Sequence, residues 1–172
     1  SNGRLAANYS ISAGQTTTAD VTAKAMTVSG ITASNKTYDS TTSATLGTGA
    51  VSYGGIVSGD DFAGSYSGVF SDKNVGTGKT VNITSSYSGA DVSNYSVTDQ
   101  STTTANITAK SLTVSGITAS DKIYDGSTSA TLDPSLVIYS GLVTGDTFDG
   151  TYTGVFSNAN VGTGKTVNIT PS

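Results

Sequence analysis

The strongest constraint in this sequence is that its second half repeats its first. Residue i matches residue i + 86 without an insertion or deletion, and roughly 60% of the aligned positions are identical. Residues 28–34 return at 114–120, and residues 74–84 return at 160–170. Solenoid repeats are about 20–45 residues long, so this longer period predicts a domain-sized module.

The repeat permits two divisions of the chain. An equal division gives a first repeat at residues 1–86 and a second at residues 87–172. The junction 104–110 contains neither Gly nor Pro, which favours a short, stiff connection. A boundary there gives a complete module at 21–106 and a truncated module at 107–172. Residues 1–20 are then homologous to the missing piece, which predicts strand-swapped self-association with a second copy.

Short segments of alternating polarity predict an all-β fold. In residues 79–84, Val81 and Ile83 face one side; in residues 65–70, Tyr66 and Phe70 do the same. Gly, Asp and Asn turns separate about seven such strands in each repeat. We expect two tandem antiparallel β-sandwich modules of immunoglobulin-like type. The alternative is a β-grasp-like α+β module with one short helix at residues 56–62.

The composition excludes several kinds of site. Cys and His are absent, so the usual zinc sites and the Ser/Cys–His catalytic arrangements cannot be built. No nucleophile–base pair recurs in both copies, and we therefore expect neither an enzyme nor a cofactor. The net charge of −4 speaks against a nucleic-acid partner, and no apolar stretch is long enough for membrane insertion.

Two polar motifs suggest ligand sites, each with a plainer structural interpretation. Residues 76–80 and 162–166 read Gly-Thr-Gly-Lys-Thr, but a strand follows where a phosphate-binding loop requires a helix, so a Gly-rich turn is expected. Calcium is the other ligand considered, with Asp60, Asp61, Asp72 and Asp146 as its candidate ligands. Asp and Asn that end strands by local hydrogen bonds explain the same residues.

The nine tyrosines suggest a surface that binds sugars. Tyr53, Tyr87 and Tyr152 are the candidate glycan contacts, because an exposed tyrosine ring stacks on a sugar and its hydroxyl bonds one. Several tyrosines recur with the period of the repeat, which also fits a role in the core.

One motif resembles a known family. Residues 122–128 read Lys-Ile-Tyr-Asp-Gly-Ser-Thr, which is similar to the signature of the YDG repeat domain. Its elements Tyr124, Asp125 and Gly126 correspond to Tyr38, Asp39 and Ser40 in the first copy. The Asp-Gly pair predicts a structural turn with a left-handed residue. The resemblance implies a tandem module of very large secreted bacterial adhesins and filamentous-haemagglutinin-like exoproteins.

Repetition and resemblance together predict a stalk. We expect a structural spacer that projects a binding region from the bacterial surface, located outside the cell, with the neighbouring repeats as its main partners. The alternative is a weak, multivalent module that binds a host or matrix glycan or protein and gains avidity by repetition.

Overall fold

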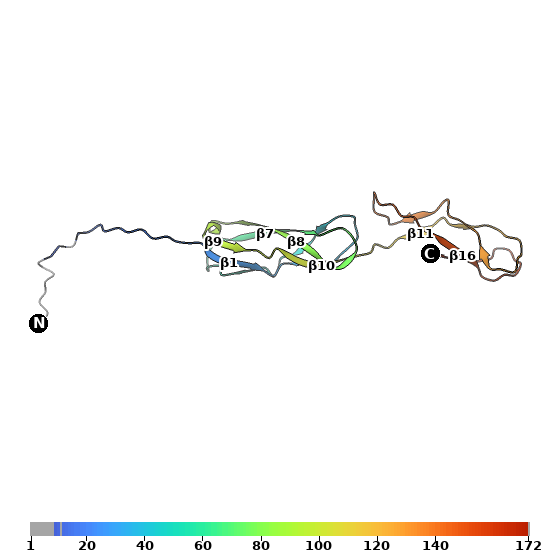
Figure 1. Cartoon of the computed structure of the whole chain (residues 1–172), viewed down its shortest axis with the longest axis horizontal. Coiled ribbons are helices and arrows are strands. Elements are labelled where there is room, and N and C mark those ends of the chain that lie inside the picture. The colour runs from blue at the N-terminus through green and yellow to red at the C-terminus, as the bar shows by residue number, and fades with distance from the viewer. Residues whose placement is uncertain (1–8, 11, 172) are drawn as a thin grey trace.

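Two β-rich modules follow one another along the long axis of the molecule (Figure 1). The computed structural model describes residues 9, 10 and 12–171. The first module occupies residues 24–108 and the second residues 113–171. Residues 12–23 precede the first module as an exposed segment that contains no strand, at the end of that module opposite the second.

The first module contains two main sheets. The three-stranded sheet has the order β6 (Ser52–Gly54), β1 (Lys24–Ser29), β9 (Tyr95–Thr98). The five-stranded sheet has the order β3 (Lys36–Thr37), β10 (Thr102–Thr108), β8 (Gly76–Ser88), β7 (Ala63–Phe70), β4 (Ser43–Ala44). A small pair joins β2 (Thr32–Ala33) to β5 (Leu46–Gly47), and a 3₁₀ turn, η2, covers Val92–Asn94.

The second module repeats part of this arrangement. Strand β11 (Thr113–Ser115) pairs with β15 (Ile138–Ser140), and β12 (Thr118–Ala119) pairs with β14 (Leu132–Asp133). A three-stranded sheet has the order β13 (Ser129–Ala130), β16 (Tyr152–Phe156), β17 (Val167–Pro171). Between residues 109 and 171, no strand corresponds to β9 or β10.

The prediction of an all-β chain is confirmed, and so is the alternation within the predicted strands. Val81 on β8 and Phe70 on β7 are buried, while the residues beside them in sequence are exposed. Residues 56–62 contain one turn, at 58–59, and no helix, so the helix required by the β-grasp alternative is not there. Two pairings, β1 with β9 and β10 with β3, are parallel, whereas the sequence suggested antiparallel pairs throughout.

Strands β9 and β10 complete the first module. Strand β9 lies beside β1, and β10 lies between β8 and β3. The buried side chains of β10, Ala105 and Ile107, pack with Phe70 and Val81 in one core cluster. Residues 95–108 therefore supply two strands to the module that begins at Lys24. An equal division of the chain assigns these residues to the second repeat.

The second module buries its corresponding side chains less well. Phe70 is 2% exposed and Val81 is fully buried, whereas their counterparts Phe156 and Val167 are only half-buried. Val114 is 43% exposed although its counterpart Val28 is buried. The difference follows from the missing partners of β11 and β17, because the strands that cover these positions in the first module have no counterparts among residues 109–171.

Candidate functional site

In both modules, a lysine at the centre of a network of polar contacts holds the Tyr-Asp turn. Lys36 Nζ lies 2.7 Å from Asp39 Oδ1 and also donates hydrogen bonds to the backbone oxygens of Thr41 and Ser43. Asp39 Oδ1 accepts the backbone N–H of Thr41 at 2.9 Å. The lysine thus ties the two arms of the turn together.

The second copy repeats these contacts with its own residues. Lys122 Nζ lies 2.7 Å from Asp125 Oδ1, and Asp125 Oδ1 accepts the N–H of Ser127 at 2.8 Å. Each lysine also lies over a phenylalanine ring, Lys36 over Phe70 at 5.6 Å and Lys122 over Phe156 at 5.8 Å. The network therefore anchors the turn to the sheet.

These contacts lower the pKa of the turn carboxylates. The hydrogen bond from Lys36, followed by those from Thr41, lowers the pKa of Asp39 from 3.8 to about 2. The hydrogen bond from Lys122, followed by those from Ser127, lowers the pKa of Asp125 to about 2 as well. Both carboxylates are exposed, and both are hydrogen-bonded within their own turn. These contacts give the turn motif a structural role.

The residue after the aspartate is left-handed in both copies. Gly126 has φ of 78°, as the Asp-Gly pair predicts, and Ser40 has φ of 66°. Ser40 is the one described non-glycine residue with a positive φ, which is a strained conformation for a side chain with a Cβ. The turn therefore keeps its shape although the first copy departs from the family signature at this position.

The candidate glycan tyrosines lie in two equivalent aromatic clusters. In the first module, Phe62 contacts Tyr53 and Tyr87 with ring centroids 5.1 Å apart in each case, and Tyr66 donates its hydroxyl to that of Tyr53 at 3.1 Å. Tyr87 donates to Asp99. These tyrosines are half-buried and their hydroxyls are occupied.

The second module repeats the tyrosine pair. Tyr152 donates its hydroxyl to that of Tyr139 at 3.0 Å, and Tyr139 packs against Phe148 at 5.0 Å. Desolvation raises the pKa of Tyr66, while the hydrogen bond to Tyr139 raises the pKa of Tyr152 to about 12. The structure thus gives Tyr53, Tyr87 and Tyr152 partners within their own modules.

The four candidate calcium ligands have separate partners. Asp60 Oδ2 accepts the hydroxyl of Tyr95 at 2.5 Å, and Asp72 Oδ1 lies 2.7 Å from Lys79 Nζ. The Asp61 carboxylate accepts the N–H of Ala90. Asp146 accepts a hydrogen bond from Ser40. Within residues 9, 10 and 12–171, no three acidic side chains converge as a metal site requires.

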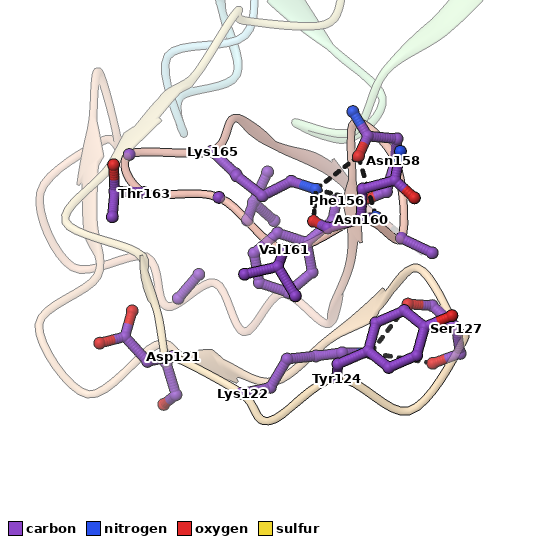
Figure 2. A pocket seen from close by; sticks show the side chains of 16 residues that line it. Asp121, Lys122, Tyr124, Ser127, Phe156, Asn158, Asn160, Val161, Thr163 and Lys165 are labelled. Atoms are coloured by element: carbon purple, nitrogen blue, oxygen red, sulfur yellow. Dashed lines mark hydrogen bonds between the residues drawn. The ribbon is translucent and has the colours of Figure 1, made fainter.

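A groove lies in the second module, beside the Tyr-Asp-Gly turn. It has a volume of about 520 Å³ and lies between the turn segment 119–127 and the Gly-Thr-Gly-Lys segment 162–165. In Figure 2, Lys165 and Asn158 lie on one side and Lys122 and Tyr124 on the other, with Phe156 and Val161 between them. Val161 is 88% exposed and Tyr124 63% exposed.

Comparison with protein families assigns a YDG domain to residues 22–105 and another to residues 108–172. The chain belongs to the YDG-domain family. No curated protein and no solved structure matches the chain significantly.

The two YDG segments coincide closely with the strand pairing. The first, ending at residue 105, takes in all of β9 and part of β10; the second begins at residue 108, where β10 ends.

No helix among the described residues is long and apolar enough to cross a membrane.

Sequence reasoning found the Tyr-Asp turn but missed the anchoring role of Lys36 and Lys122. The lysine precedes the tyrosine by two residues in both copies, and that fixed spacing to the aspartate was the available signal. It also missed the groove of the second module, because a groove depends on which strands lie side by side.

Proposed function

We propose that this chain is a structural stalk, a pair of spacer modules from a bacterial cell-surface or secreted adhesin that holds a binding region away from the cell. The modules are of the immunoglobulin-like sandwich class in this proposal, which the two main sheets of the first module support. The proposal places the chain outside the cell and gives it a mechanical role in place of a catalytic one.

The observation that carries the proposal is the in-line arrangement of two like modules across a short junction (Figure 1). Only residues 109–112 separate β10 from β11. Ser40 of the first module donates to Asp146 of the second, with 3.4 Å between the oxygens. Apolar side chains of both modules, Val75 on one side and Phe148 on the other, line the same cavity at the junction. A stiff junction keeps a tandem array extended, as a stalk requires.

Small-angle X-ray scattering tests the stalk. The maximum dimension of a four-module concatemer should be about twice that of the 172-residue chain, whereas flexibly joined modules extend roughly as the square root of their number. A maximum dimension that grows far less than twofold contradicts a stiff spacer. A loosened control, with four Gly-Ser residues inserted after Ala109, should fall below the twofold increase.

Weak, multivalent binding of a glycan or matrix component remains the alternative proposal. The structure supports it less, because the hydroxyls of Tyr66, Tyr87 and Tyr152 bond within their own modules. A glycan array probed with the folded chain separates the two proposals. Specific binding that is lost when Tyr53 and Tyr139 are both replaced by alanine, in protein that still melts cooperatively, supports adhesion and argues against a passive stalk.

A further inference from the structure

The first and last stretches of the first module lie side by side along the module. The first stretch, residues 24–37, includes β1, β2 and β3, and the last, residues 95–108, includes β9 and β10. Strand β1 is parallel to β9 from Lys24↔Tyr95 onward, and β3 is parallel to β10 from Lys36↔Ile107 onward. Each partner lies 71 positions later in the chain in both sheets, so the two stretches keep a single register.

Side chains link the two stretches where the chain passes from one sheet to the other. Gln100 bonds both backbone groups of Ile31: its Oε1 accepts the N–H at 2.9 Å and its Nε2 donates to the C=O at 2.6 Å. Closer to the second module, Asn35 Oδ1 accepts the N–H of Asn106 at 2.7 Å. The two parallel ladders are therefore connected and form one continuous contact.

The same two stretches supply most of the buried core. Among the residues that the structure describes, they contribute six of the eight buried apolar side chains: Met26, Val28, Ile31, Tyr95, Ala105 and Ile107. Burial keeps water from the inner side of these strands, which strengthens their hydrogen bonds. Separation of the two stretches would expose this core, so the module cannot stay folded without their contact.

Tension along the chain pulls these two stretches in opposite directions. The chain enters the first module at β1, at the end that faces away from the second module, and leaves it after β10, at the end that faces the second (Figure 1). Because the two stretches are parallel, such a pull slides one along the other. Their hydrogen bonds join neighbouring strands and therefore lie across the line of the pull, so the bonds carry the load together.

We propose that stretches 24–37 and 95–108 form a mechanical clamp, a set of contacts that keeps the first module folded under tension along the chain. The β1–β9 and β3–β10 ladders are sheared as a unit, with the bonds between Gln100 and Ile31 connecting them. In this role the inference deepens the proposed stalk and rests on it, since a stalk has to transmit a pulling force. The clamp itself is a property of the module, so a weak clamp would overturn this inference and leave the scattering test of the stalk unaffected.

Single-molecule force spectroscopy with two attachment geometries tests the clamp. The chain contains no cysteine, so pairs of introduced cysteines define where the full chain is held. Thr16→Cys with Lys110→Cys applies tension along the first module and leaves the second module outside the loaded path. Thr16→Cys with Ser93→Cys is the matched control. Ser93 is exposed and lies two residues before β9, so this pull separates β1 from β9 at one end and opens the ladder one pair at a time.

The two geometries should give different unfolding forces for the same folded module. At one loading rate, the force along the module should be at least about twice the force in the control geometry, because forced unfolding follows the barrier to rupture and that barrier is higher when the bonds must break together. Equal forces in the two geometries, or a lower force along the module, overturn the proposal.

Gln100→Ala tests the link between the two ladders. It removes both bonds to Ile31, so the rate of unfolding at a fixed tension along the module should rise by about tenfold. Asp72→Ala is the matched control, because it also removes two hydrogen bonds, from Lys79 Nζ and from the N–H of Asn74, but outside the clamp. Its unfolding rate should stay within about twofold of the wild-type rate. The proposal fails if Gln100→Ala unfolds no faster than Asp72→Ala under this tension. If either variant does not melt cooperatively, the comparison of the two geometries decides alone.

Discussion

Ser40 in the first module donates its hydroxyl to the Asp146 carboxylate in the second, with 3.4 Å between Oγ and Oδ1. Lys73 Nζ donates to the same hydroxyl at 3.1 Å. The counterparts of Ser40 and Lys73 in the second repeat are Gly126 and Ala159, which cannot make this bridge. The residue that departs from the Tyr-Asp-Gly signature therefore hydrogen-bonds to the next module.

The Ser40 position allows a test of local strain. Replacing Ser40 with Gly should stabilise the first module by about 1 kcal/mol, because glycine adopts a positive φ without the clash of a Cβ. The reverse change at the equivalent position, Gly126→Ser, should destabilise the second module by a similar amount. Urea titration of both variants measures the effect, and equal stability of all three chains would contradict a strained Ser40.

Ser40→Gly should also make the junction between the two modules less stiff, although it stabilises the first module. Ser40→Gly removes the hydroxyl that joins Lys73 to Asp146, so the angle between the modules should vary more widely. X-ray scattering should show a broader distribution of distances for Ser40→Gly than for wild type. Asp146→Ala removes the other partner of the bridge without touching the turn, and it should give the same broadening with no gain in stability.

The two modules should respond unequally to loss of the same core ring. Phe70→Ala should destabilise the first module by about 3–5 kcal/mol, because the ring is 2% exposed and its removal leaves a cavity. Phe156→Ala should cost clearly less, since the half-buried Phe156 lines the groove and water can fill the space. Denaturant titration of the two variants gives the comparison. Equal losses would show that the second core is as well covered as the first.

The lowered pKa values of the turn carboxylates predict that the modules lose stability in acid. The folded-state pKa of Asp39 is about 2, below the ordinary 3.8, so its contribution to stability is present above about pH 4 and is lost as the pH falls through 2. Asp39→Asn should therefore flatten the fall in melting temperature between pH 4 and 2. Lys36→Gln should flatten it too, because Lys36 is the main cause of the lowered pKa. An unchanged slope in both variants would contradict the network as the cause.

Local chemistry explains why much of the fold was predictable. The alternation at Val81 and Ile83 and the turn at Asp125 and Gly126 depend on neighbouring residues, and the structure confirms both. The parallel pairing of β1 with β9 was not predictable, because it joins residues about 70 apart in sequence with no local signal. The individual contacts of the candidate tyrosines also depend on tertiary packing. Tyr53 meets Phe62 and Tyr66 only when strand β6 packs beside the start of β7.

A repeated glycine beneath the tyrosine pair gives the last prediction. A Cβ on Gly64 would lie 2.7 Å from the Tyr53 hydroxyl and closer still to that of Tyr66. In the second module, a Cβ on Gly150 would meet Tyr139 and Tyr152 in the same way. Gly64→Ala should therefore destabilise the first module by about 1–3 kcal/mol, the usual cost of overpacking.

Gly49 provides the matched control, since a Cβ there would meet nothing within 4 Å. Gly49→Ala should change the free energy of unfolding by less than about 0.5 kcal/mol. Adding Tyr66→Phe to Gly64→Ala removes the nearest hydroxyl, so the double variant should recover part of the loss. If Tyr66→Phe restores nothing, the glycine is required for a reason other than the close approach of the two hydroxyls. If Tyr66→Phe restores part of the lost stability, the close approach of the two hydroxyls to the glycine is the reason, and both repeats retain this packing contact.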